Sequence, residues 1–275
     1  MPPNLRVLSN LPAGYAAFSI ADERAVRLLS DAEERHFWFS TRNHFLSERL
    51  QALGCVPPAH FLELGCGGGA VAAHLSRLGF EVTGVDGHLA RVREAARRTP
   101  RGLFLVHDLE KGTQPLTTGA YEGVGLFDVL EHLDQPREAL IAALRCARPG
   151  GLLVGTVPAL MSLWSQIDTE AGHRLRYDEK SLTHLLESIP DASILEICPF
   201  NRTLVPILWF QRRLLRGKSS DIPVGTHLKV PPAAVNLALI VLVTIERRLA
   251  PALDKTRLPG ASLWFALRKN AAPNL

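Results

Sequence analysis

The sequence predicts an α/β fold in which helices cover both faces of a largely parallel β-sheet. Short apolar runs, with the length of buried strands, alternate with longer segments that carry the apolar stripe of a helix. A glycine-rich turn joins one of these strands to the next helix, and an acidic residue ends the strand after it. With 275 residues, 47% of them hydrophobic, the chain can form one such domain with additions to it.

Residues 60–86 hold the unit on which the rest of the prediction depends. The apolar run Phe61–Leu64 is too short for a helix and suits a buried parallel strand. The glycines of Gly65–Gly69 permit a tight turn and let a ligand approach the backbone, and the helix that follows ends at Gly79. A second strand ends at Asp86. Because a helix start offers unpaired N–H groups and the acid can accept from ribose hydroxyls, this βαβ unit predicts a nucleotide site.

The spacing within this unit leaves the kind of nucleotide open. Gly65, Gly67 and Ala70 match the dinucleotide pattern G-x-G-x-x-G/A, and Asp86 follows at about the 20-residue distance that the pattern expects. Glu63, however, is a charged group inside an apolar strand, which costs free energy unless it is paired. Glu63 argues against NAD, and a nicotinamide oxidoreductase that uses the same turn is kept as the alternative.

The remaining elements follow from the same signals. Pro136 begins a helix, and Arg145 and Arg148 lie near its C-terminal end, as capping and dipole rules expect. Gly123 and Gly125 weaken the strand propensity of the run that holds them. Strands are predicted at residues 103–106, 121–126, 152–157, 193–198 and 262–268, and helices at 21–53, 89–98, 136–147, 178–188, 203–215 and 233–249.

The N-terminal part divides into an arm and a helical segment. Residues 1–20 contain prolines and a glycine without periodicity, which predicts a loose arm. Asp22 and Asp31 are candidate N-caps within the helical segment. The three consecutive aromatic residues 37–39 cannot all face one core. They either cover a pocket or belong to a helix that packs ahead of the sheet.

Three blocks beyond the glycine turn carry a family resemblance. They are Asp108 at the end of the third strand, Asp128-Val129-Leu130-Glu131-His132-Leu133, and Arg148-Pro149-Gly150-Gly151. With these, about residues 33–198 resemble the class I S-adenosylmethionine (SAM) dependent methyltransferases, within the small-molecule group that includes quinone-biosynthesis enzymes. The resemblance implies a Rossmann-like seven-stranded sheet, an N-terminal helical lid and a helical insertion before the last strand. Glu122 stands where the family usually has Asp, so this strand departs from type.

The same resemblance implies SAM as the cofactor, S-adenosylhomocysteine as its product, and a residue set for each part of the cofactor. The implied contacts are Glu63, Gly65, Cys66, Gly67 and Gly69 at the methionine and ribose, Asp86 and Gly87 at the ribose hydroxyls, Asp108 and Leu109 at the adenine, Asp128, Val129, Leu130 and His132 beside the methyl group, Trp38 over the site, and Arg42 at the methionine carboxylate.

Three side chains are candidates for a proton acceptor or a substrate contact. His132 lies at the mouth of the predicted site, and an imidazole with a near-neutral pKa suits general base catalysis. His173 and Tyr177 follow the fifth strand, where substrate loops usually lie. For each of the three, a purely structural role is the alternative. The predicted acceptor is a small, partly apolar molecule that is methylated at oxygen.

The same block also carries a pattern of possible metal ligands. Asp128-x-x-Glu131-His132 matches a pattern that is linked to a divalent metal in quinone-type O-methyltransferases, and clustered oxygen and nitrogen ligands can hold Mg or Zn. The same residues recur in relatives that have no metal. The prediction is therefore that no metal is used.

The segment 200–259 interrupts the expected hairpin of the last two strands. It holds two apolar helical patterns that end in arginines, and its longest apolar run is shorter than the ~20 residues that span a bilayer. Three interpretations stay open: a cap over the active site, a dimer face, or an interfacial membrane helix with snorkelling arginines. The predicted divisions are 1–53 (arm and lid), 54–199 (SAM-binding core), 200–259 (insertion) and 260–275 (final strand and tail).

Composition limits the partners. The net charge of +4 comes without a Lys/Arg block interleaved with aromatic residues, so no nucleic acid is expected. The four cysteines are scattered without metal-ligand spacing, which is typical of a reducing compartment. The N-terminus lacks the pattern of a signal peptide, and we expect a cytoplasmic protein, with membrane association through 200–259 left open. A non-catalytic partner protein with the same fold is the second alternative.

Overall fold

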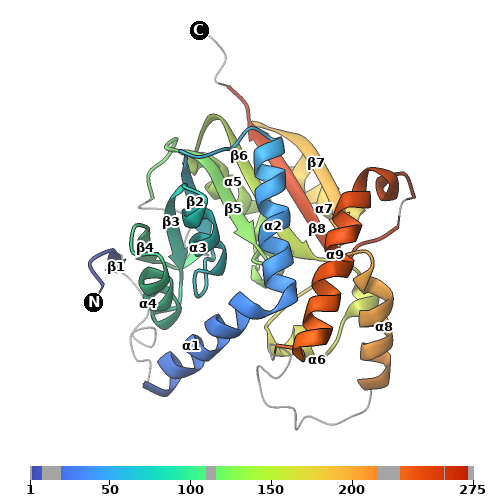
Figure 1. Ribbon diagram of the computed structural model, residues 1–275. Helices are drawn as coiled ribbons and strands as arrows, with labels where there is room; N and C mark the ends of the chain where they lie inside the picture. The colour runs from blue at the N-terminus through green and yellow to red at the C-terminus, as the bar shows by residue number, and fades with distance from the viewer. Residues whose placement is uncertain (1, 8–19, 110–115, 216–229, 257, 272–275) are drawn as a thin grey trace.

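The computed structural model describes residues 2–7, 20–109, 116–215, 230–256 and 258–271 (Figure 1). It confirms the α/β fold and contains an eight-stranded sheet with the order β1-β4-β3-β2-β5-β6-β8-β7. β8 is antiparallel to both of its neighbours, and the other pairs are parallel. The strands are β1 Leu5–Val7, β2 His60–Leu64, β3 Glu81–Asp86, β4 Leu103–Val106, β5 Tyr121–Phe127, β6 Ala147–Pro158, β7 Ala192–Phe200 and β8 Ser262–Lys269.

Helices lie on both faces of this sheet. One set of buried side chains joins α2, α3 and α4 to one face, and a second set joins α5 and α7 to the other. The short α6 was not predicted. The helices are α1 Ile20–Arg35, α2 Phe37–Ala52, α3 Ala70–Arg77, α4 Leu89–Arg98, α5 Pro136–Cys146, α6 Gln166–Glu170, α7 Glu179–Glu187, α8 Leu204–Leu215 and α9 Ala233–Leu253.

The strand β1, which the sequence did not predict, corrects the prediction of a loose N-terminal arm. Leu5–Val7 pairs in parallel with β4, so residues 1–20 are not loose throughout. The Asn4 side-chain amide donates to the carbonyl oxygens of Ala96, Thr99 and Gly102, at 3.1, 3.1 and 3.0 Å, and this anchors the strand. A strand of three residues is too short to carry a period-2 pattern, which is why the sequence did not reveal it. Residues 8–19 of the predicted arm lie outside the described residues.

The helical segment predicted at 21–53 is two helices. His36 separates α1 from α2; its backbone is extended, and its Nδ1 accepts from the Trp38 N–H at 3.2 Å. His36 is therefore the N-cap of α2. The predicted caps Asp22 and Asp31 are wrong, because both lie inside α1.

Glycines in the central strand make room for aromatic rings. A Cβ on Gly123 would lie 2.6 Å from the Phe61 ring, and one on Gly125 would lie 2.6 Å from the Phe127 ring. These two rings stack with their centroids 6.4 Å apart. The glycines that weaken β-propensity in β5 are thus required by the packing of the core.

The insertion between β7 and β8 is bonded to the core domain. The Glu246 carboxylate of α9 accepts from the N–H groups of Arg202 and Thr203 and from the Thr203 hydroxyl, at 2.7, 2.8 and 2.6 Å, and so caps the start of α8. Asn236 bonds the Phe37 N–H and the Arg35 carbonyl at the junction of α1 and α2, both at 2.9 Å. α9 lies alongside α2 (Figure 1). Within the described residues, each helix is too short or too polar to cross a membrane.

Candidate active site

The glycine turn after β2 presents bare backbone at one point. Gly65, Gly67 and Gly69 all have positive φ, at 78°, 52° and 80°. A Cβ on Gly65 would lie 2.5 Å from the Val129 side chain, and one on Gly69 would lie 2.7 Å from Ala95. At Gly67, no atom of the described residues lies within 4 Å of the Cβ position. The first and last glycines are thus packing requirements, and Gly67 is where a ligand can approach.

Asp86 anchors this turn to the next strand. Its Oδ2 accepts from the Gly67 N–H at 2.9 Å, and its Oδ1 accepts from the His88 N–H at 2.8 Å. Gly87 follows as a partly buried bend. Because each carboxylate oxygen has a second lone pair, Asp86 can still accept from a ligand's hydroxyl groups.

Glu63 and Cys66 are buried at the turn, and burial raises the pKa of both side chains. Glu63 is 3% exposed, and its Oε2 has no hydrogen-bond partner among the described residues. Burial raises the pKa of the Glu63 carboxyl to about 8, although the charge of Arg42 opposes this. Burial also raises the pKa of the Cys66 thiol well above its usual range, so this thiol does not supply a nucleophile. The orphaned Glu63 oxygen is a built acceptor for a polar ligand group.

The end of β4 brings Asp108 to the same sheet edge. Val106 is the register partner of Asp86, and Asp108 follows two residues later. Asp108 is partly buried, while the partly buried Leu109 packs against the hydrophobic core that includes side chains of β5 and α5. Both predicted adenine contacts therefore lie near Asp86 at the carboxyl ends of the strands, where ligands of such sheets bind.

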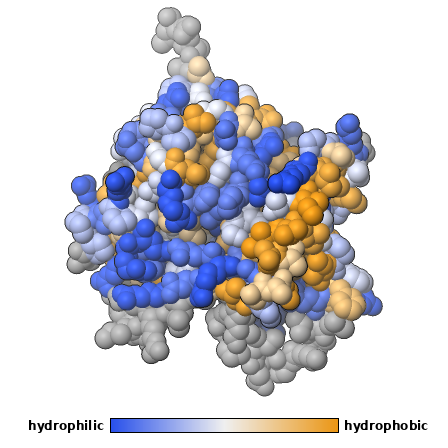
Figure 2. All heavy atoms as spheres, viewed as in Figure 1, coloured by the Kyte–Doolittle hydropathy of each residue, from blue (hydrophilic) through white to orange (hydrophobic). Residues whose placement is uncertain are grey.

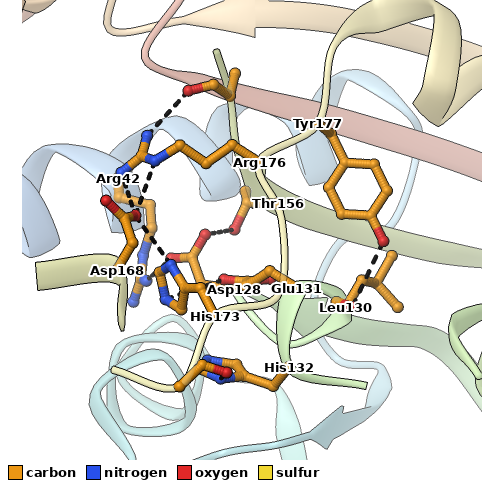
Figure 3. Close-up of polar contacts among 12 residues, drawn as sticks. Arg42, Asp128, Leu130, Glu131, His132, Thr156, Asp168, His173, Arg176 and Tyr177 are labelled. Carbon is orange, nitrogen blue, oxygen red and sulfur yellow. Dashed lines mark hydrogen bonds and ion pairs between the residues drawn. The ribbon is translucent and has the colours of Figure 1, made fainter. Parts of the chain in front are cut away.

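Asp128 connects the end of β5 to the helix that precedes the sheet. Its φ of 55° is in the left-handed region, which non-glycine residues rarely adopt. Its Oδ2 accepts from Arg42 Nη1 at 2.7 Å, and its Oδ1 accepts from the Thr156 hydroxyl at 3.0 Å (Figure 3). Arg42 is 7% exposed. The guanidinium of Arg42, which the resemblance implies at the methionine carboxylate, here pairs with a carboxylate of the chain.

Trp38, which the resemblance places over the site, makes apolar contacts. It contacts the edge of the Phe37 ring and joins a small apolar cluster with Leu204 and Val243, between α2, α8 and α9. The structure thus assigns Trp38 to the contact between the lid helix and the insertion.

Val129, Leu130 and Tyr177 are buried side chains. Val129 packs against Gly65, and Leu130 is fully buried. The Tyr177 hydroxyl donates to the Leu130 carbonyl at 3.5 Å and points away from the histidines (Figure 3). Burial, with the nearby Glu131, raises the pKa of Tyr177 to about 12. The structure does not bring Tyr177 together with the other two base candidates.

His132 and His173 do lie together. Their rings meet edge to face with centroids 4.8 Å apart, and His132 Nδ1 lies 3.3 Å from the Gly172 carbonyl. Burial, and then the neighbouring His173, lowers the pKa of His132. His132 is therefore neutral at pH 7, which is the form that accepts a proton.

His173 lies between two carboxyl groups. Its Nδ1 is 3.1 Å from Asp168 Oδ1, and its Nε2 is 3.9 Å from Glu131 Oε1. Glu131 is fully buried, and neither oxygen has a hydrogen-bond partner in the part of the chain that is described. Burial, followed by the charge of Asp128, raises the pKa of the Glu131 carboxyl well above its usual range.

Glu131, His132 and His173 carry donor atoms of the kinds that bind a metal ion. One donor atom each from Glu131, His132 and His173 lies within 4.8 Å of the others. Asp128, the first residue of the sequence pattern for a metal, is instead held by Arg42 and Thr156. The pattern is therefore not gathered into one ligand set here.

Asp168 lies beside His173 and is not among the site residues that the sequence predicts. It is fully buried and accepts from Arg176 Nε at 2.8 Å, and Arg212 Nη1 of α8 lies 3.5 Å away. Although burial alone would raise it, the pKa of the Asp168 carboxyl is held well below its usual range by hydrogen bonds from His173 and Arg176 and by the charge of Arg212. The one available signal was Ser165-x-x-Asp168, a capping-box pattern, which indicates a helix start rather than a charge cluster.

Comparisons with known proteins show the family of the chain. Residues 35–189, more than half of the chain, match the family model described as a methyltransferase domain. A mitochondrial ubiquinone biosynthesis O-methyltransferase from Schizosaccharomyces pombe is 32% identical over 125 residues, which are 43% of this chain and 45% of that protein. A ubiquinone biosynthesis O-methyltransferase from Caulobacter sp. is 36% identical over 101 residues, 34% of this chain and 38% of that protein. The chain thus spans less than half the length of these relatives.

Solved structures share the fold at lower identity. The geranyl diphosphate C-methyltransferase from Streptomyces coelicolor A3(2), solved with Mg²⁺, geranyl-S-thiolodiphosphate and S-adenosyl-L-homocysteine, superposes with a TM-score of 0.55 and 15% identity. The match covers 84% of this chain and 76% of that one. At this identity the likeness speaks for the fold alone.

Replacement of Asp168 by Asn tests the buried charge cluster. Asp168→Asn leaves Arg176 buried without its carboxylate, and breaking a buried pair in this way costs about 3–5 kcal/mol. We expect a loss of that order in urea unfolding at pH 7. Because the folded-state pKa is depressed, the loss relative to the native chain should be full above about pH 4 and should shrink as the pH falls below it. The exposed Glu170→Gln on the same helix is the matched control, and an equal loss in both variants would contradict the assignment.

Proposed function

The chain belongs to the methyltransferase-domain family, and from that membership we propose that it transfers a methyl group from SAM to a hydroxyl oxygen of a small, partly apolar acceptor. The observation that carries the cofactor assignment is the open backbone at Gly67, flanked by the orphaned oxygen of Glu63 and by Asp86. A nucleoside with an amino-acid tail needs bare backbone that it can approach closely, together with buried acceptors for its polar hydrogens. These residues fit that need.

Each cofactor contact has a proposed role. Glu63 accepts from the methionine part, Asp86 with Gly87 accepts from the ribose hydroxyls, and Asp108 with Leu109 bounds the adenine. Arg42 can exchange Asp128 for the methionine carboxylate, because the two carboxylates would compete for one guanidinium. When bound, SAM supplies an electrophilic methyl group on its sulfonium.

The chain's own contribution to the chemistry is to orient the acceptor and to take its proton. We assign His132, neutral because of its lowered pKa, as the general base, with His173 as the rival for that role. Asp168 and Glu131 flank the His173 ring and act as positioning residues. Tyr177 packs the loop, and no metal enters the proposal.

The acceptor is proposed from the relatives' names and from the insertion. Both sequence relatives are named for O-methylation in ubiquinone biosynthesis, which favours a hydroxyl on a partly apolar molecule. We propose that the inner side of the segment 200–259 caps the site, because Arg212 pairs with Asp168 and Asn236 bonds the lid helix. The proposed divisions are 1–53, with Leu5–Val7 joined to the sheet, then 54–199, 200–259 and 260–275.

Calorimetric titration with SAM, S-adenosylhomocysteine and NADH tests the cofactor. We expect binding of the two SAM-type ligands alone, and Asp86→Ala should weaken it at least tenfold because acceptors for the ribose are lost. Glu81→Ala, an exposed acid at the other end of β3, is the control and should bind normally. Binding of NADH alone would mean an oxidoreductase, and folded protein that binds none of the three ligands would end the proposal.

The proton balance of SAM binding tests Glu63. With its pKa near 8, the free carboxyl is protonated at pH 7, whereas a carboxylate that accepts from the ligand is ionised. SAM binding should therefore release close to one additional proton at pH 7 compared with Glu63→Gln, and this release should vanish as the pH rises above about 8. Titrations in buffers of different ionisation enthalpy measure it. An identical proton count in both proteins would remove Glu63 from the contact set.

Methyl transfer to a panel of hydroxylated ring compounds, with and without an apolar chain, tests the base. His132→Gln should lower kcat by roughly 10²–10⁴ while the Kd for SAM stays the same. The lowered pKa predicts that the native rate holds as the pH falls from 7.5 to below 6.5 before it declines. His184→Gln, exposed on α7, should be unchanged. A larger loss in His173→Gln than in His132→Gln would exchange the two assignments.

A further inference from the structure

The outer side of α8 and α9 carries large apolar side chains that no other described part of the chain covers. In α9 the exposed residues Leu237, Val241, Ile245 and Leu249 recur every four positions, which places these four in one stripe along the helix. Figure 2 shows this stripe as an apolar band over α9. We define the outer face by its large exposed residues, with exposed fractions of 44–60%: Ile207, Trp209, Phe210, Val235, Leu237, Val241, Ile245 and Leu249.

The charged side chains exposed on α8 and α9 themselves are all basic. Arg213 is exposed and its guanidinium lies 5.2 Å from the centre of the Trp209 ring, and Arg248 is exposed beside Leu249. Within the described residues of α8 and α9, Glu246 is the single acid, and it is 5% exposed because it caps α8. An apolar stripe with cations and an aromatic ring at its rim is complementary to an anionic lipid surface.

We infer that the outer face binds the interface of an anionic lipid bilayer, with α9 lying in the plane of the membrane. α9 has 21 residues and lies along the surface of the molecule, so about 30 Å of helix can contact lipid at once. A second copy of this chain is the competing occupant. Self-association through the same face would bring its cations together without an exposed acid on α8 or α9 to pair them.

The outer face is connected to the candidate active site through short bonded paths. On α8, Arg212 pairs with Asp168, which bonds His173. On α9, Asn236 bonds the Phe37 N–H at the start of α2, the helix that carries Arg42. A lipid-bound α8–α9 pair therefore holds the acceptor side of the site next to the membrane, where an acceptor with an apolar chain would be dissolved.

Vesicle flotation of the full chain tests the inference. We expect the native protein to float with vesicles of phosphatidylcholine containing phosphatidylglycerol, and to float far less with phosphatidylcholine alone or in high salt. Leu237→Glu combined with Val241→Glu and Ile245→Glu should weaken binding at least tenfold. Leu78→Glu, equally apolar and 44% exposed at the end of α3, is the control and should float like the native chain.

Trp209 supplies a second measurement that a misfolded variant cannot imitate. Anionic vesicles should shift the tryptophan emission of the native chain to shorter wavelength, and most of this shift should be absent in Trp209→Phe. Calorimetric SAM binding by the triple variant should stay normal, which separates a failure of lipid docking from a failure of the proposed function. Absence of flotation with anionic vesicles, flotation that the triple variant leaves unchanged, or a dimer in light scattering that the triple variant abolishes would each overturn the inference.

Discussion

The hydrogen bond from the Gly67 N–H to the Asp86 carboxylate is the contact on which the site depends. It ties the turn after β2 to the end of β3, and the Val85 carbonyl adds bonds from the Gly65 and Cys66 N–H groups at 2.7 and 2.9 Å. These bonds hold the turn in the left-handed conformations that glycine permits. Because the turn is held from the neighbouring strand, Gly67 can stay open to a ligand while Gly65 and Gly69 are packed shut.

Carboxyl groups of the candidate site are buried in two opposite ways. Glu63 and Glu131 are desolvated without sufficient partners, so their pKa values are raised, whereas Asp168 is surrounded by donors and its pKa is depressed. Glu63 therefore lowers folding stability as the pH rises from its unfolded value, near 4.5, to about 8, because the folded state keeps a proton that the unfolded state has released. Such a cost is typical of a ligand site, where a bound group would satisfy the carboxylate.

The parts that local sequence encodes were predictable, and the parts that depend on distant contacts were not. The glycine turn, Asp86 and the strand pattern follow from short-range rules, and residues 89–98 and 103–106 form the predicted helix and strand. β1 was not predicted because it is stabilised by its pairing with β4 and by hydrogen bonds of the Asn4 side chain. The charge cluster at Asp168 was not predicted because Arg176 and Arg212 come from separate parts of the chain. Tyr177 is a candidate base from its position in the sequence. The direction in which its hydroxyl points depends on tertiary packing, which the local sequence does not encode.

The topology of the sheet decides where the insertion must lie. β8 is antiparallel to β6 and to β7, and Ser262 at its start is the register partner of both Pro158 and Phe200. The ends of β6 and β7 therefore share the edge of the sheet at which β3 and β5 place Asp86 and Asp128. A segment that joins β7 to β8 in place of a tight hairpin has to project from this edge, beside the site. A membrane that binds α8 and α9 is consequently held next to the acceptor side of the candidate active site. An apolar face on these two helices therefore matters for function as well as for packing.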